Sequence, residues 1–568
     1  MSRSTWDTVV CDVLVLGSGG AGLCAALHMA DSKRPPSVVM AVKGLFGKSG
    51  CTRMVQGGYN AVLQEEDSLE KHFLDTLKGG QWINDQELAW KLVSEAPGRV
   101  LELENRVGCF FDRDANGNVH QKAFAGQSFD RTVHKGDLTG IEIINRLAEQ
   151  VDVTEHTTVM EEVRAVDLLL DTSGTRVVGA LLLNLRSGAF VVAHAKATLL
   201  ATGGGPTMYK IAAPCHDKSC DGIAMAYRAG APLMDMEMVQ FHPTGLLIGT
   251  RMITGSVLEE GLRGAGGYLK NGLGERFMHK YDSREERATR DVVSRGSYTE
   301  IMEGRGTADE GVLLDASHLG ADFIQEKFRG MTLRCKDMGY DLTREPVPVS
   351  PTAHFMMGGV PIDPECRTAL EGLFAAGEDA SGVHGANRLG GNGVAESTVY
   401  GGLAGDVMAT VTAEMELRPF SQAQVEALIE KSVRPVMRET GGSVYELRDR
   451  MKETMWRKAG VVRERAQLES ARADLAELRE QLGQVSAGGG REYNLAWADT
   501  LNMENYLDVS EAIVNGALAR EESRGSHYRT DFPDQDDANF RCNLMLTKSE
   551  PRPVKREVVF SRMSPDLA

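Results

Sequence analysis

The sequence lacks an excess of basic residues. Aspartate and glutamate number 80 against 63 lysines and arginines, which gives a formal net charge of −17. A surface that binds nucleic acid needs clustered positive charge, and no run of basic residues interrupts the acidic balance of this chain. The sequence therefore predicts that nucleic acid is not a partner.

Long hydrophobic runs are also missing. The most apolar N-terminal stretch, VVCDVLVLG, contains Asp12 and is much shorter than the ~20 apolar residues that a membrane helix needs. No later window approaches that length. We therefore expect no direct membrane span and a cytoplasmic location, with any attachment to the cytoplasmic face of a membrane made through partner subunits.

Paired cysteines are the third absence. The nine cysteines are scattered singly, and none belongs to a CxxC pair. The ligand spacing of an iron–sulfur cluster or a zinc site is therefore not present, and we predict no metal site in this chain. Reduced thiols of a cytosolic protein are the expected state.

The chain is long enough to form several hydrophobic cores. The 568 residues are 42% hydrophobic, which indicates a multidomain globular protein. Near the N-terminus, DVLVL (12–16) is typical of a buried strand and is followed by GSGGAG (17–22) and the alanine-rich LCAALHMA. Strand, glycine turn and helix in this order favour a dinucleotide site, with the pyrophosphate at the N-terminus of the helix.

The second predicted strand argues against NAD. An acidic residue that binds ribose hydroxyls is expected about twenty positions after the glycines, but SVVMAV ends at Lys43. Two more apolar segments run into glycines, KATLLATGGG (196–205) and GLFAAGEDAS (372–381), and the second offers Glu378 to ribityl or ribose hydroxyls. Three such junctions favour one extended FAD.

A series of motifs then identifies a family resemblance. In chain order these are GSGGAG, MVQGGYNAV, FAGQSFDRT, ATGGG, FHPTG, EEGLRGAGGYL, TRDVVSR, PTAHFMMGGV, LFAAGED, HGANRLGGNG and EESRGSHYRTDFP. Their order resembles that of the flavoprotein subunits of succinate dehydrogenase and fumarate reductase over nearly the whole chain. L-aspartate oxidase is similar over much of the same length and is the nearest competitor.

The resemblance implies an α/β fold in which a Rossmann-like FAD-binding domain carries an inserted α+β capping domain and is followed by a helical domain. We expect the discontinuous FAD-binding domain at 1–240 and 345–412, the capping domain at 241–344, the helical domain at 413–535 and a strand-rich tail at 536–568. Closure of the cap over the active site would exclude water.

The resemblance also implies site residues. Those expected to bind FAD are Gly17, Gly19, Gly20, Gly22, Lys43, Gln56, Gly57, Gly58, Thr202, Gly203, Gly204, Asp221, Glu378, Asn392 and Gly393. Those expected to bind a dicarboxylate substrate are His242, Thr244, His354, Arg388 and Phe124. An arginine fork matches a carboxylate, and the glycines around Arg388 leave room for substrate and cofactor.

Proton transfer is assigned by resemblance to Arg290, with Glu260 and Arg263 as its relay. An arginine in water stays protonated, so it needs such a relay to act as acid or base. The spacing of Glu260 and Arg263 places them on one helical face or turn, and a surface ion-pair network is the alternative interpretation.

Two positions depart from the family pattern. Cys51 stands where respiratory members carry a histidine bound covalently to the flavin. We therefore predict a non-covalent FAD, with a cysteinyl–flavin thioether as the less favoured alternative, and chemistry tilted toward fumarate reduction. Glu259 replaces a threonine that contacts a substrate carboxylate. A carboxylate facing a carboxylate is unfavourable unless it is protonated, bridged or turned away, so Glu259 leaves the substrate open.

The predicted function is interconversion of fumarate and succinate by hydride transfer at flavin N5, with electrons exchanged with an iron–sulfur protein subunit. The alternatives are a self-contained enzyme like L-aspartate oxidase, in which Glu259 meets an amino group, and a reductase of another unsaturated acid. A non-catalytic flavin-binding or assembly protein is a third class, disfavoured because the relay and clamp positions other than the threonine are suitably occupied.

Overall fold

A computed structural model describes residues 6–215, 217–249, 251 and 253–565. Its largest sheet has the order β6-β2-β1-β9-β8-β7, and β16 pairs with β9 beyond this path. The strands are β1 (Trp6–Leu16), β2 (Val38–Val42), β6 (Thr157–Glu161), β7 (Val163–Leu170), β8 (Val177–Asn184), β9 (Phe190–Leu200) and β16 (Leu373–Ala375).

The pairing of these strands brings the three predicted junctions together. β1 is parallel to β2 and to β9, and β16 is parallel to β9, in the register Leu373 to Thr198. The carboxyl ends of parallel strands meet at one edge of a sheet, which is where open α/β sheets bind ligands. The glycine segments that follow Leu16, Leu200 and Ala375 therefore lie at one edge.

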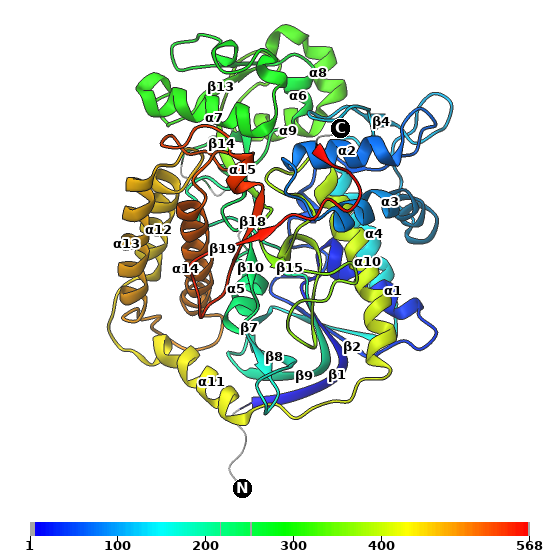
Figure 1. The fold of residues 1–568 in the computed structure, drawn as a ribbon, viewed down its shortest axis with the longest axis vertical. Coiled ribbons are helices and arrows are strands. Elements are labelled where there is room, and N and C mark those ends of the chain that lie inside the picture. The colour runs from blue at the N-terminus through cyan, green and yellow to red at the C-terminus, as the bar shows by residue number, and fades with distance from the viewer. Residues whose placement is uncertain (1–5, 216, 250, 252, 566–568) are drawn as a thin grey trace.

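Helices α1 (Gly20–Asp31) and α10 (Asn392–Thr412) pack closely against each other although their sequences are far apart. Small residues permit this approach, because a Cβ at Gly401 would lie 2.4 Å from the carbonyl oxygen of Ala21. The same flank carries α2 (Leu69–Gly79), α3 (Gln86–Glu102) and α4 (Thr139–Asp152) (Figure 1). Side chains of Ser68 and Asp85 cap α2 and α3.

A second body with its own core lies at one end of the molecule, drawn in green at the top of Figure 1. Its antiparallel sheet has the order β11-β14-β13-β12. The elements are β11 (Val239–Leu246), α6 (Gly261–Gly264), β12 (Tyr268–Lys270), α7 (Arg290–Glu300), β13 (Val312–Asp315), α8 (Ala321–Lys327), α9 (Arg329–Asp337) and β14 (Val347–Met356). The chain leaves the domain of the main sheet along β11 and returns along β14.

The C-terminal part is helical and packs against the main core. It consists of α11 (Gln422–Met437), α12 (Val444–Lys458), α13 (Arg465–Leu482) and α14 (Leu495–Ala519), which form the flank opposite α1 and α10 in Figure 1. After α15 (Asp537–Phe540), strands β18 (Cys542–Leu546) and β19 (Val554–Glu557) extend β10 (Leu233–Met234). The predicted strand-rich tail is thus joined to the body of the protein by strand pairing.

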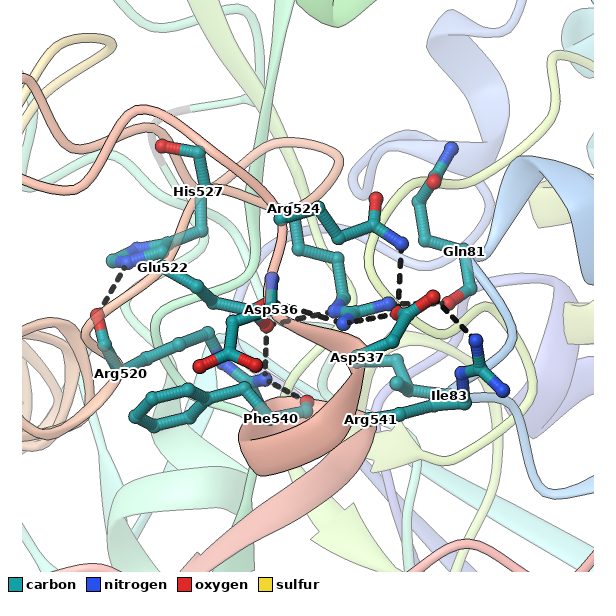
Figure 2. A network of polar contacts seen from close by, with 12 residues as sticks. Gln81, Ile83, Arg520, Glu522, Arg524, His527, Asp536, Asp537, Phe540 and Arg541 are labelled. Atoms are coloured by element: carbon teal, nitrogen blue, oxygen red, sulfur yellow. Dashed lines mark hydrogen bonds and ion pairs between the residues drawn. The ribbon is translucent and has the colours of Figure 1, made fainter.

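A buried polar network fixes the segment between α14 and α15 (Figure 2). Glu522 accepts hydrogen bonds from Arg520 and Arg524, at 3.0 and 2.7 Å. Arg524 also donates to the carbonyl oxygen of Gln81 at 3.0 Å. The backbone N–H of Ser526 donates to the carbonyl of Ala386, so this C-terminal segment supports the loop that carries Arg388.

The other strands form two small sheets, one of β3 (Tyr59–Asn60), β5 (Thr132–Val133) and β4 (Gln121–Lys122) and one of β15 (Val360–Pro361) and β17 (Ala380–Ser381). Helix α5 (Asp221–Arg228) packs against α14 and β7. The architecture confirms the predicted α/β class, with a mostly parallel sheet, an inserted α+β body and a C-terminal helical region. The exact domain boundaries stay a prediction. Among the described residues, no helix has the length and apolarity required to cross a membrane.

Candidate active site

One cavity of about 790 Å³ extends from the glycine turn after β1 to the inserted body. This volume lies in the range of pockets that hold cofactors and small substrates. The predicted site residues that line the cavity are Gly17, Gly19, Gly20, Lys43, Gln56, Gly57, Gly58, Phe124, Thr202, Gly203, Asp221, His242, Glu260, Arg290, His354, Glu378, Arg388 and Gly393. Residues from distant parts of the sequence therefore line one cavity.

Gly17 and Gly22 form the tight turn between β1 and α1. Gly17 has φ +106°, and a Cβ there would lie 2.3 Å from the carbonyl oxygen of Ala201. A Cβ at Gly22 would lie 2.1 Å from the carbonyl oxygen of Gly17. At Gly19, by contrast, a Cβ would meet only Thr52, at 3.7 Å, so bare backbone faces the cavity at the N-terminus of α1.

Lys43 and Asp221 form an ion pair at the cavity wall. Lys43 Nζ lies 2.9 Å from Asp221 Oδ2 and also donates to Ser219 and Asn502. Burial alone would raise the pKa of the Asp221 carboxyl, but Lys43 and Arg164 lower it to about 2. Asp221 is therefore ionised, and Lys43 has its three donors occupied.

Glu378 is held by Lys218, a residue that sequence reasoning missed. Lys218 Nζ donates to Glu378 Oε2 at 2.5 Å, and the backbone N–H of Met356 donates to Glu378 Oε1 at 3.1 Å. The adjacent Asp379 accepts from the backbone N–H and hydroxyl of Thr202, which joins the ends of β9 and β16. Glu378 and Asp379 therefore link the segments that follow the parallel strands β9 and β16.

The inserted body supplies the opposite end of the cavity. His242 lies on β11 and His354 on the neighbouring β14, with their rings 5.5 Å apart. Arg388 stacks over Phe355, at 4.4 Å from the ring centroid, and reaches the same region from the loop before α10. Phe124 covers Gly57 and Gly390 so closely that a Cβ at either glycine would clash with its ring.

Arg290, Glu260 and Arg263 form a continuous buried chain. Arg290 Nε donates to Glu260 Oε2 at 2.8 Å, and Arg263 Nη2 lies 3.7 Å from Glu260 Oε1. Arg290 and Glu260 line the cavity, whereas Arg263 lies behind them and donates to the carbonyl oxygen of Glu286. All three side chains are at least 90% buried, so the alternative of a surface ion-pair network does not hold.

Gln240 links Arg290 and Arg388, and it was not among the site residues predicted from the sequence. Its Oε1 accepts from Arg290 Nη1 and from Arg388 Nη2, each at 3.2 Å. A neutral acceptor between two cations keeps their guanidinium groups oriented without cancelling their charge. The cavity end is therefore positive and suited to an anionic ligand.

Burial and the neighbouring arginines together set the protonation of the groups at this end of the cavity. Burial and the charge of Arg290 depress the pKa of His242 well below its usual range, and burial with Arg388 does the same for His354. Both imidazoles are therefore neutral near pH 7. Burial and Arg290 lower the pKa of Arg388 to about 9, which leaves it protonated. Burial opposes ionisation of Glu260, but Arg290 and Arg263 lower its pKa overall.

Glu259 lies on the cavity wall and forms an ion pair with Lys122. Burial raises the pKa of the Glu259 carboxyl, while Lys122 opposes that shift. The lysine comes from β4, outside the inserted body, and the glutamate precedes α6 of the inserted body. Glu259, the residue that departs from the family pattern, is thus paired with a cation.

Five predicted site residues do not line the cavity: Gly22, Gly204, Thr244, Arg263 and Asn392. Gly22 acts through the turn described above, and Gly204 lies against the side chain of Glu378. Thr244 donates to the carbonyl oxygen of Leu258 at 2.7 Å, with its hydroxyl 3.3 Å from His242 Nδ1. Thr244 therefore supports His242 from behind.

Asn392 is the first residue of α10 and is buried behind the cavity wall. Its Oδ1 accepts from Asn60 at 2.7 Å and contacts His72 Nε2 at 3.0 Å. Gly391, Gly393, Val394 and Ser397, at the start of this helix, line the cavity. Asn392 thus anchors the start of the helix.

The residues present fit an FAD. The open backbone at Gly19 leaves space for a pyrophosphate at a helix N-terminus. Gln56 Oε1 and Arg388 Nε are buried and lack a hydrogen-bond partner among the described residues, although both residues line the cavity. Such atoms are expected where a polar ligand completes the site.

The comparisons with known proteins agree with this geometry. Residues 12–394 match the family model described as an FAD binding domain, and residues 448–567 match that of the fumarate reductase flavoprotein C-term. The chain belongs to the family of fumarate reductase and succinate dehydrogenase flavoprotein subunits. It is an FAD-binding oxidoreductase of that family.

Two curated relatives illustrate the similarity. A fumarate reductase (CoM/CoB) subunit of Methanothermobacter marburgensis is 44% identical over 96% of this chain and 99% of its own. The succinate dehydrogenase flavoprotein subunit of Rickettsia felis is 35% identical over 95% of this chain and 93% of its own. Both matches cover the flavin, inserted and C-terminal parts.

A solved structure shows the same architecture. The FrdA chain of E. coli quinol fumarate reductase, determined as a mutant, matches with a TM-score of 0.92 and 32% identity. The match covers 98% of each chain. The inserted body and the C-terminal helices are therefore features of the family fold.

Proposed function

We propose that this protein interconverts fumarate and succinate, with FAD held non-covalently in the cavity and Arg290 as the proton donor and acceptor. The observation that carries the proposal is the Arg290–Glu260–Arg263 chain, which ends at the cavity beside Arg388. When bound, FAD supplies the hydride chemistry at one carbon of the substrate.

The substrate clamp consists of Arg388, His242 and His354. The guanidinium of Arg388 presents a planar fork to one carboxylate, and the two neutral imidazoles offer N–H donors. Holding both carboxylates fixes the reacting carbons between cofactor and proton donor, which contributes to the rate by orientation. Stacking on Phe355 restricts where Arg388 can point.

The proposed proton path consists of the buried side chains of Arg290, Glu260 and Arg263. Arg290 sits at the cavity with Nε bonded to Glu260, and Arg263 flanks the other oxygen of that carboxylate. After Arg290 gives its proton to the substrate carbon, the Glu260 carboxylate takes a proton from Arg263 and passes it to Arg290, and Arg263 then regains a proton from solvent. Arg263 keeps Glu260 ionised and oriented between turnovers.

The ion pair of Glu259 favours a dicarboxylate over aspartate. In the oxidase alternative, Glu259 would bind the amino group of the substrate, but Lys122 already supplies an ammonium to that carboxylate. Neutralised in this way, Glu259 presents less repulsion to a substrate carboxylate. The C-terminal match to a fumarate reductase flavoprotein model supports the same choice.

We further propose that the electrons pass to or from an iron–sulfur subunit, because the chain resembles flavoprotein subunits over nearly its whole length and these relatives are named as subunits. The predicted cytoplasmic location, with a membrane reached only through partner subunits, belongs to this part of the proposal.

Substrate choice is tested by anaerobic spectroscopy of the flavin. Dithionite-reduced protein is mixed with fumarate, and oxidised protein is mixed with L-aspartate. We expect fumarate to restore the absorbance of oxidised flavin and aspartate to leave it unchanged. Bleaching by aspartate would assign an amino-acid oxidase activity, and no response to either compound would assign another unsaturated acid.

A further inference from the structure

Two thiols face each other in the wall of the flavin cavity. The Sγ atoms of Cys51 and Cys215 are 3.9 Å apart, and the backbone N–H of Cys215 lies 3.4 Å from Cys51 Sγ. Cys51 precedes a short helix after β2, and Cys215 lies in the long connection between β9 and α5. Two distant segments are therefore in contact through sulfur.

Exposure distinguishes this pair from the other cysteines. Cys51 and Cys215 are partly exposed and both line the cavity. The other seven free cysteines are buried: Cys11, Cys24, Cys109, Cys220, Cys335, Cys366 and Cys542. Within the part of the chain that the structure describes, only the cavity pair combines proximity with access.

The surroundings of the two thiols make Cys215 the nucleophile and Cys51 its hydrogen-bond donor. A hydrogen bond from Cys51, aided by the charge of Lys218, lowers the pKa of Cys215 to about 7 against the opposing effect of burial. The same hydrogen bond and burial raise the pKa of Cys51 well above its usual range. Cys215 is thus the thiol that ionises, and Cys51 stabilises its thiolate.

We propose that Cys51 and Cys215 are a reversible dithiol–disulfide pair that reacts with low-molecular-weight disulfides at the flavin cavity. This inference is independent of the fumarate reaction and uses none of the clamp or relay residues. Forming the bond requires the two Sγ atoms to approach from 3.9 Å to about 2.05 Å. The disulfide would cross-link the segment after β2 to the segment before α5.

The exchange proceeds in two balanced steps. The Cys215 thiolate attacks one sulfur of a small disulfide, which forms a mixed disulfide and releases one small thiolate. Cys51 then loses its proton to solvent and attacks Cys215 Sγ, which forms the protein disulfide and releases the second small thiolate. Two protein thiols are oxidised and one small disulfide is reduced to two thiols.

The test uses the purified full-length protein with its flavin bound. After treatment with oxidised glutathione, free thiols are alkylated under denaturing conditions and peptides are mapped by mass spectrometry. We expect one cross-link, Cys51 to Cys215, that dithiothreitol reverses, and alkylation of the other seven thiols. Flavin absorbance and fluorescence, recorded before and after, report how the cross-link changes the environment of the cofactor.

Single variants separate the two roles. Cys51→Ser should retain glutathione on Cys215, because no second thiol resolves the mixed disulfide, whereas Cys215→Ser should leave Cys51 unmodified. Cys542→Ser, in the tail sheet, is the matched control and should behave like the wild type. The proposal is overturned if Cys215 accumulates glutathione in the wild type without a cross-link, or if neither thiol reacts. Flavin that stays attached to Cys51 after denaturation would also overturn it.

Discussion

Lys122 and Glu259 form an ion pair that joins the flavin domain to the inserted body at the cavity wall. Removing the lysine leaves a buried carboxylate beside the dicarboxylate site, so Lys122→Met should raise the KM for fumarate about tenfold at pH 8. The increase should be smaller at pH 6, because the pKa of Glu259, already raised by burial, rises further without Lys122.

The paired variant Lys122→Met with Glu259→Gln tests the cause. It removes both charges, so the KM should return toward the wild-type value, and the exposed Lys327→Met on the inserted body should have no effect. A raised KM that persists in the double variant would show that Lys122 contributes by packing or by direct contact with the substrate.

Glu260→Gln should interrupt proton return to Arg290. We expect turnover to fall by roughly 10²–10⁴, the usual contribution of a positioned acid or base. The KM should not rise, because the substitution removes a negative charge from the site of an anionic substrate. Steady-state kinetics with flavin content as the folding check measure this, and Glu326→Gln at the surface is the control. Near-normal turnover would remove Glu260 from the relay.

Gln240 is predicted to orient Arg290 and Arg388 without neutralising them. Gln240→Glu places a negative charge between the two guanidinium groups, so the KM for fumarate should rise by roughly tenfold or more. Gln240→Met is similar in length and adds no charge, and its effect on KM should be smaller. Equal effects of both substitutions would assign Gln240 a packing role only.

The buried side chain of His72 makes the stability of the protein depend on pH. Burial, with the nearby charge of Arg131, lowers the pKa of His72 to about 4. In the unfolded chain, His72 binds a proton near pH 6.5. The contribution of neutral His72 to the free energy of unfolding is therefore complete above pH 6.5 and is lost as the pH falls from 6.5 toward 4. In His72→Gln, denaturant unfolding at pH 7.5, 6 and 5 should show a flatter decline. An unchanged slope would contradict the assigned pKa.

Local patterns predicted the parts of the site that lie within one stretch of chain. The glycine turn of Gly17 follows from strand, turn and helix in sequence, and the closeness of Glu260 and Arg263 follows from their spacing. The resemblance placed Arg290 and Arg388 in the same cavity. These predictions required either local geometry or a known motif order.

The partners of these residues could not be predicted, because they depend on tertiary contacts. Lys218 meets Glu378 across 160 positions, and Lys122 meets Glu259 across 137. Neither lysine belongs to a pattern that marks a site. Thr244 shows the converse, since its side chain lies behind the cavity although it follows His242 by two residues on β11 and lies in the same motif.

The most direct test of the account is single-turnover reoxidation of the reduced flavin by fumarate, measured anaerobically in the wild type and in Arg290→Lys. Lysine keeps a positive charge but cannot reproduce the bonds of Arg290 to both Glu260 and Gln240. We predict rapid reoxidation in the wild type and a rate lower by roughly 10²–10⁴ in the variant, with FAD retained. Equal rates in the two proteins, or no reoxidation of the wild type, would contradict the account.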